Sequence, residues 1–150
     1  MFGFDAEQKV THRTKLKNLQ IQTAAYGRVI PIIYGTARVA GNIIWAQPIK
    51  EASDTKMGYA TIAIAICNCE VKRLHGIWAD GKSLSFDEID YTFYHGTEDQ
   101  NPDPFIVSID GEGNVPAYRG ISYIVIKDFP LVDRVPVFTF EVLSIPQIEG

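Results

Sequence analysis

Hydrophobic and polar residues alternate along most of this chain with the period of two that is typical of β-strands. The clearest run spans 59–67, where Ile62, Ile64 and Ile66 share one face and small residues occupy the other. Because both faces are apolar or small, we expect a central strand covered on both sides. The same pattern predicts further strands at 19–23, 29–34, 36–40, 42–46, 71–79, 82–84, 91–95, 121–127 and 136–143.

Turn and loop signals separate these runs. Pro31 lies inside the 29–34 run, and because proline lacks a backbone N–H, this strand should be an edge strand or contain a bulge. The Asp80-Gly81 pair predicts a type I′ hairpin that leads into 82–84. The polar stretch 48–57 predicts a loop. The candidate core residues of 71–79 are Leu74, Ile77 and Trp78, and in the last strand Phe138, Phe140 and Val142 should share one face.

One segment departs from the strand pattern and predicts a short helix over 103–110. Asp103 is a favoured N-cap residue, because its carboxylate accepts a hydrogen bond from the first turn. Pro104 suits the first helical position, where no N–H is needed, and Gly111 can end the helix in the left-handed region. The apolar face of this helix should consist of Phe105, Ile106 and Ile109.

These elements together predict a mainly-β fold. About eight short strands, joined by Gly, Pro and Asp turns and accompanied by one short helix, favour a small barrel or a sandwich, with an α+β variant as the alternative. The 150 residues suit one domain, or two small ones, with a substantial core. Residues 1–15 show no strong period, so we expect a poorly ordered or weakly helical segment there and a single β domain over 16–146.

Composition narrows the function classes. The chain is 46% hydrophobic and carries a net charge of −4, so it does not resemble a disordered tail or a nucleic-acid-binding protein. Its one basic run, 12–17, is expected to be solvated. No apolar run reaches the length of a transmembrane helix, and the N-terminus lacks the features of a signal peptide. We therefore expect a protein made in the cytoplasm.

The two cysteines, Cys67 and Cys69, point to the same face if the strand continues through them. A bridge between them would strain an extended backbone, so we expect reduced, partly buried thiols. The histidines are scattered and show none of the spacings of zinc sites: they are His12, His75 and His95. No metal or other cofactor is expected.

The acidic residues suggest several chemistries. A pair of carboxylates could hydrolyse a glycoside, and Glu98, Asp99 and Asp103 could bind calcium through oxygen atoms. Turn and cap roles explain most of these acids more simply, and we predict no catalytic residue. Aromatic residues over 91–95, such as Tyr94, could stack on a sugar, although alternating aromatics in a strand more often belong to a core or an interface.

Four segments, taken in order, resemble a known group of proteins. They are YGTARVAGNIIWA at 34–46, AIAICNCEVKRLHGIWADGKSL at 63–84, FYHGTEDQNPDPFI at 93–106 and PAYRGISYIVIKDFPL at 116–131. Together they resemble the tail-tip proteins (baseplate hub or host-specificity proteins) of long-tailed phages and gene transfer agents. The resemblance extends over most of the chain, roughly 16–142. Members of that family are longer, so we expect a fragment or the product of a split or shortened gene.

The resemblance implies a structural role rather than an enzymatic one. Such proteins form a ring, usually a trimer, at the tail tip of the virion and connect the tail tube to host-recognition proteins, so contact with the host surface would be indirect. The alternatives are a carbohydrate-binding β domain and a cell-wall hydrolase module. Candidate edges for assembly are 29–34 and 137–143. The candidate assembly contacts are Pro31, Tyr94, Glu98, Asp99 and Arg119, the last because its guanidinium matches a neighbour's carboxylate.

Overall fold

The computed structural model describes residues 30–47, 50–51, 58–131 and 134–144. This part of the chain is mainly β and contains a single short α-helix, which confirms the predicted fold class. Its elements are β1 (Gly35–Ala40), β2 (Asn42–Ala46), β3 (Lys50–Glu51), β4 (Gly58–Cys67), β5 (Val71–Ala79), β6 (Lys82–Leu84), the 3-10 helix η1 (Phe86–Glu88), β7 (Asp90–Tyr94), α2 (Pro104–Asp110), β8 (Ser122–Leu131) and β9 (Phe138–Ser144).

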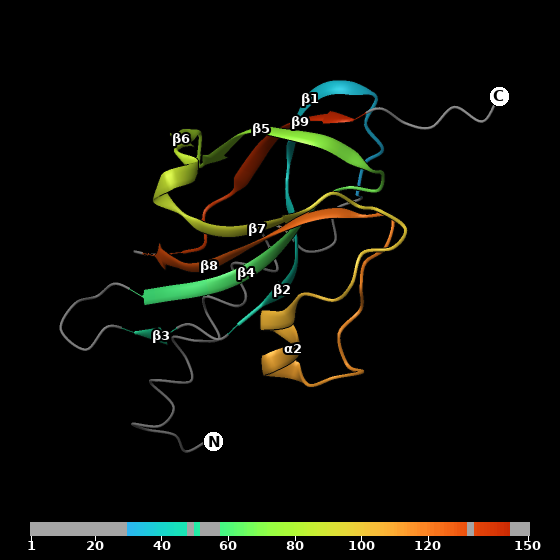
Figure 1. Cartoon of the computed structure of the whole chain (residues 1–150). Coiled ribbons are helices and arrows are strands. Elements are labelled where there is room, and N and C mark those ends of the chain that lie inside the picture. The colour runs from blue at the N-terminus through green and yellow to red at the C-terminus, as the bar shows by residue number, and fades with distance from the viewer. Residues whose placement is uncertain (1–29, 48–49, 52–57, 132–133, 145–150) are drawn as a thin grey trace, which may run out of the picture.

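The strands form two antiparallel sheets that pack face to face (Figure 1). Sheet A has the order β1-β9-β5-β6, and sheet B has the order β2-β4-β8-β7 with β3 paired to β4. β1 and β2 are consecutive in the chain but belong to different sheets, and Gly41 lies between them. A Cβ atom at Gly41 would lie 2.2 Å from Ile64 and 2.7 Å from Phe140. Only glycine therefore lets the chain cross between the sheets at this point.

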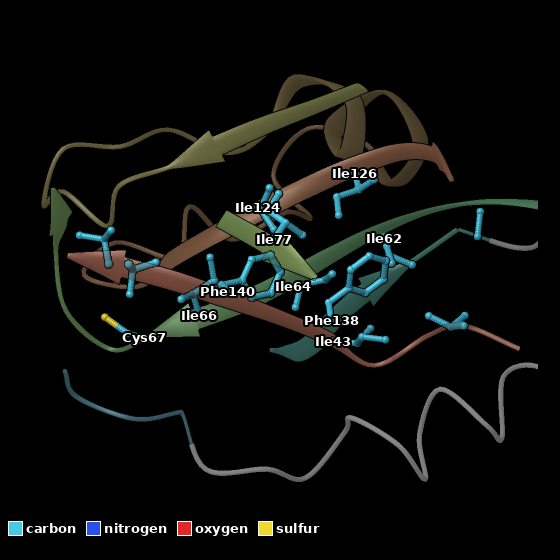
Figure 2. Close-up of a cluster of buried hydrophobic side chains, with 14 of the residues drawn as sticks. Ile43, Ile62, Ile64, Ile66, Cys67, Ile77, Ile124, Ile126, Phe138 and Phe140 are labelled. Atoms are coloured by element: carbon cyan, nitrogen blue, oxygen red, sulfur yellow. The ribbon is translucent and has the colours of Figure 1, made fainter. Parts of the chain in front are cut away.

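The main hydrophobic core lies between the two sheets. Alternate residues of β9 point into it: Phe138, Phe140 and Val142 share one face, as predicted, and all three are buried. They meet isoleucines of β4 and β8 from the opposite sheet, as Figure 2 shows. Full burial of one such side chain stabilises the fold by about 1.5–3 kcal/mol. The labelled isoleucines of this core are Ile43, Ile62, Ile64, Ile66, Ile77, Ile124 and Ile126.

β4 has the central, doubly covered position that its sequence predicts. Ile62 and Ile64 face the core between the sheets, whereas Ala63 and Ala65 face a second apolar cluster on the outer side of sheet B. The register of β4 against β8 shifts between Ala65 and Cys67. Such an irregularity changes which face a side chain occupies, and Cys67 accordingly joins the isoleucine side.

The hairpin between β5 and β6 also follows its sequence. Asp80 and Gly81 both have positive φ, 51° and 82°, as the central residues of a type I′ turn require. The Asp80 carboxylate accepts hydrogen bonds from Arg134 at 3.0 and 3.2 Å and from the Val137 amide at 3.0 Å. These contacts hold the pKa of Asp80 below its ordinary value, and the hydrogen bond from the Val137 amide has the largest effect.

Both edge predictions are wrong within the described residues. β9 lies between β1 and β5, in the interior of sheet A, so 137–143 is not an edge. Residues 30–34 form no strand, and β1 begins only at Gly35. Pro31 has no N–H to donate to a ladder; its carbonyl instead accepts a hydrogen bond from the Asn68 amide at 2.6 Å. The true edge of sheet A on this side is β1.

The cysteine prediction is also wrong, because Cys67 and Cys69 form a disulfide. β4 ends at Cys67 and the chain bends at Asn68, so the backbone between the two cysteines is not extended. Their Cα atoms are 5.4 Å apart, compared with about 6.6 Å for residues i and i+2 of a regular strand. This separation lies within the usual range for a disulfide.

Several predictions lie wholly or partly outside the described residues: the N-terminal segment 1–15, the basic run 12–17, the strand 19–23 and much of the loop 48–57. Within that loop, Lys50–Glu51 form the short strand β3 instead. The helix α2 matches its prediction in place and length, but of its expected apolar face only Ile106 is buried. Ile109 is 45% exposed.

Candidate functional site

The two outer faces of the sandwich differ, and this difference defines the candidate site. Residues 96–121, which we name the capping segment, include α2 and cover the outer face of sheet B (Figure 1). Ile106 of α2 packs in a cluster with Tyr123 and Val125 of β8 and with alanines of β4. At the other end of the helix, the Trp45 indole donates a 2.8 Å hydrogen bond to the Asp110 carboxylate.

Asp103 anchors the start of the capping segment. One carboxylate oxygen accepts a hydrogen bond from the Ile106 amide at 3.0 Å, and Pro104 opens the helix. The other oxygen accepts a 2.6 Å hydrogen bond from the Tyr94 hydroxyl. Asp103 is only 2% exposed. A buried carboxylate with both oxygens engaged is a structural group, and it is poorly placed to bind calcium or to act on a substrate.

Tyr94 belongs to a stack of tyrosines beneath this cap. Its ring lies parallel to that of Tyr123, with centroids 4.6 Å apart, and Tyr118 meets Tyr123 edge-on at 5.2 Å. The pKa of Tyr94 is raised far above its ordinary value. Burial is the largest cause, and the hydrogen bond to Asp103 is the second. Burial likewise raises the pKa of Tyr123. Because one face of the Tyr94 ring is occupied by Tyr123, that face is not open to stack on a sugar.

Gln100 holds the two ends of the capping segment together, a role that the sequence does not signal. Its side-chain oxygen accepts a 3.0 Å hydrogen bond from the Gly96 amide. Its side-chain nitrogen donates to three backbone carbonyls at 2.6–3.2 Å, and Gln100 itself is 9% exposed. A glutamine in a loop is usually exposed, so no local pattern identifies it. The three carbonyls belong to Ala117, Tyr118 and Ile121.

The other predicted assembly contacts lie on the surface of this segment or away from it. Glu98 and Asp99 are exposed beside Gln100. Arg119 is exposed, and its Nε donates a 3.1 Å hydrogen bond to the Gln100 carbonyl within the same chain. Pro31 belongs to the separate segment that pairs with Asn68. Among the described residues, no three His, Cys, Asp or Glu side chains are placed to hold a metal ion.

The outer face of sheet A, by contrast, is formed by the strands themselves. Its central row places Arg38 of β1 beside Glu141 of β9 and Gly76 of β5. The Trp78 ring leans over Gly76, where a Cβ atom would lie 2.8 Å from it. The Arg38 guanidinium stacks on that ring at 3.6 Å and lies 3.9 Å from Glu141. Arg73 lies on the same face, next to Leu143.

Comparison with known proteins shows a clear similarity to a solved structure. No protein-family model and no curated protein matches the chain. A solved structure, the "Virion of native gene transfer agent (GTA) particle", contains a chain that is 38% identical, with a TM-score of 0.74. The match covers 84% of this chain but only 29% of that chain. The chain is therefore similar in both sequence and fold to part of a chain in a gene transfer agent virion.

A membrane-spanning helix is not found in the described part of the chain, where α2 has seven residues.

Proposed function

We propose that this chain is a structural, non-enzymatic component of a gene transfer agent-like or phage-like virion. Within the particle it would lie at the tail tip or baseplate. There, copies of the chain would associate into a ring, with three subunits as the expected number, and would connect the tail tube to host-recognition proteins. The chain spans 29% of its structural relative, so the role proposed here is that of one domain within a larger assembly.

The similarity to a virion chain carries this proposal. The match has 38% identity over 84% of the chain and a TM-score of 0.74, so the two chains are similar in both amino-acid sequence and fold. The geometry agrees with a structural role in one further respect. The most buried acid of the capping segment, Asp103, is engaged by Ile106 and Tyr94 rather than directed at an open cleft.

Purified particles from cells that carry this gene provide the test of the virion role. We expect mass spectrometry to detect the protein in gradient-purified particles, and immunogold labelling to place it at the tail end. Cross-linking of intact particles should give multiples of the subunit mass if the ring is correct. A protein that is abundant in the lysate but absent from purified particles would contradict the proposal, whereas label along the tube or head would contradict only its position.

The non-enzymatic part of the proposal needs a separate experiment. Asp99 is the exposed acid of the segment that lies nearest in sequence to the buried Asp103. We expect no turnover of bacterial cell-wall polysaccharide by the purified protein, measured as released reducing ends. Turnover that is lost in Asp99→Asn, with the fold intact by circular dichroism, would show that the protein is a hydrolase.

A further inference from the structure

The outer face of sheet A has the composition of a protein interface. Trp78 lies flat on it above Gly76, and Arg38 stacks on the indole. Tryptophan and arginine are the residues most enriched in binding hot spots. The outer face of sheet B is covered by the capping segment, whereas neither apolar cluster of the described residues includes Trp78 or Leu143 on the outer face of sheet A. We name the surface formed by Arg38, Arg73, Trp78, Thr139, Glu141 and Leu143 the open face.

The charged side chains of the open face, Arg38, Arg73 and Glu141, sum to a net charge of +1, although the chain as a whole is acidic. Arg38 has Glu141 as a neighbour at 3.9 Å, and both side chains are substantially exposed, at 54% and 37%. Arg73 is exposed and has no ion pair within the described part of the chain. The net charge of the whole chain is −4, so the charge of this face has the opposite sign to that of the chain as a whole. Its charge therefore complements an acidic partner.

An exposed acidic pair lies on the same molecule beyond β6, at the opposite edge of sheet A from Arg38. The helix η1 carries Asp87 and Glu88, both exposed, directly after β6. β1, which carries Arg38, is the first strand of the sheet order and β6 is the last. β6 also pairs with the end of β5 that lies away from Arg73. Figure 1 shows β6 and β1 at opposite ends of the sheet.

We propose that the open face of one copy docks the β6–η1 edge of a second copy, head to tail. Arg38 and Arg73 would meet Asp87 and Glu88, and Trp78 would supply the apolar anchor. Two different surfaces of one subunit make a heterologous contact, which closes into a ring when the rotation permits. This inference rests on the proposed self-association and names the surfaces that produce it.

Charge reversal on each surface tests the contact. The molar mass of the protein should be measured by sedimentation velocity over a concentration series, in about 50 mM and about 500 mM salt. We expect association of the wild type that weakens at high salt. Arg73→Glu and Glu88→Lys should each raise the dissociation constant at least about tenfold, because each brings like charges together across the contact. Glu112→Lys, an exposed substitution of the same charge change in the loop after α2, should have no such effect.

The mixture of the two reversed proteins is the decisive measurement. The acidic face of Arg73→Glu should bind the basic edge of Glu88→Lys, so an equimolar mixture should recover association that neither protein shows alone. A mixture that stays monomeric would overturn the proposal. So would a wild type that remains monomeric at every concentration, although detection in purified particles could still support the virion role.

A different occupant would give a different pattern of results. If Arg73→Glu abolishes binding to an acidic bacterial polysaccharide but leaves the molar mass of the protein unchanged, the open face binds a glycan instead, and the self-docking proposal is wrong. Circular dichroism and urea unfolding of each variant separate these outcomes from misfolding. Arg73 and Glu88 suit this purpose because neither side chain forms a hydrogen bond or an ion pair within the described residues.

Discussion

The Tyr94 hydroxyl donates a 2.6 Å hydrogen bond to one carboxylate oxygen of Asp103, whose other oxygen caps α2 through the Ile106 amide at 3.0 Å. One buried acid therefore joins the edge strand β7 to the capping segment. Loss of this carboxylate removes two interactions at once, which makes Asp103 more important to stability than an ordinary surface cap.

Asp103→Ala should lower the free energy of unfolding by about 2–3 kcal/mol. Loss of an N-cap costs about 1 kcal/mol, and the partly buried Tyr94 hydroxyl left without this partner adds about 1–2 kcal/mol. Urea unfolding followed by circular dichroism measures the change. Asp99→Ala, at an exposed acid of the same segment, is the matched control and should stay within about 0.5 kcal/mol of the wild type.

A double-mutant cycle with Tyr94→Phe isolates the hydrogen bond itself. Asp103→Ala and Tyr94→Phe should be less than additive, with a coupling free energy of about 1 kcal/mol or more. Strict additivity would mean that the two groups do not stabilise each other in solution.

Alkaline pH should destabilise the protein through its buried tyrosines. Burial raises the pKa of Tyr94 and of Tyr123 above the value near 10 that they have when unfolded, so the folded state holds these protons more tightly. Their stabilising contribution is therefore complete below about pH 10 and is lost as the pH rises above it. Urea unfolding at pH 8 and at pH 11 measures the loss.

The variant Tyr94→Phe/Tyr123→Phe is the control for this pH effect. It lacks both groups, so its stability should fall less between the two pH values than that of the wild type. Absorbance near 295 nm should also show that these two tyrosines ionise only when the protein unfolds. An equal fall in stability for both proteins would mean that other groups cause the alkaline loss.

Gly41→Ala should disrupt the crossing between the sheets. The added methyl group would lie 2.2 Å from Ile64 and 2.7 Å from Phe140, both in the core. Overpacking of this kind costs about 1–3 kcal/mol, and thermal unfolding should show a lower midpoint. Gly113→Ala is an instructive contrast: Gly113 has open space around it but a φ of 82°, so its cost of about 1–2 kcal/mol should come from backbone strain alone.

Structural features that depend on residues close together in the chain can be predicted from the sequence. The alternation in 59–67 identifies a doubly covered strand, and Asp103-Pro104 identifies the start of α2, because both signals lie within a few residues of the element they specify. Asp80-Gly81 predicts its hairpin for the same reason. Each of these predictions agrees with the structure.

The sequence fails where distant segments decide the outcome. Strand order in a sheet depends on pairings between remote strands, so the alternation of 136–143 could not show that β9 lies between β1 and β5. Gln100 is buried because it bonds to carbonyls 17–21 residues further along the chain. Ile109 has helical spacing, yet Ile106 is the one residue of α2 that is buried against sheet B. None of these facts has a local signature.

Reduction of the Cys67–Cys69 disulfide should cost little stability. The bridge closes a loop of only three residues, for which the chain-entropy relation gives about 1.5 kcal/mol. Urea unfolding with and without a phosphine reductant should differ by about that amount. Thiol titration of the denatured, unreduced protein checks the bridge directly and should find no free thiol, whereas two free thiols would contradict the disulfide.

Gln100→Glu should destabilise the capping segment in a pH-dependent way. The substitution replaces the donating nitrogen by an oxygen that faces three carbonyls at 2.6–3.2 Å, so at pH 7 we expect a loss of about 3 kcal/mol or more. This environment disfavours the charged form and raises the pKa of the new carboxyl above its ordinary value near 4.3. The protonated acid can donate one hydrogen bond, so the penalty should be smallest below about pH 4.3 and should grow as the pH rises through the raised pKa.

Urea unfolding of variant and wild type at pH 4 and pH 7 measures this difference in penalty, with Glu98→Gln as the exposed control. An equal penalty at both pH values would mean that the segment rearranges and exposes the carboxylate to water.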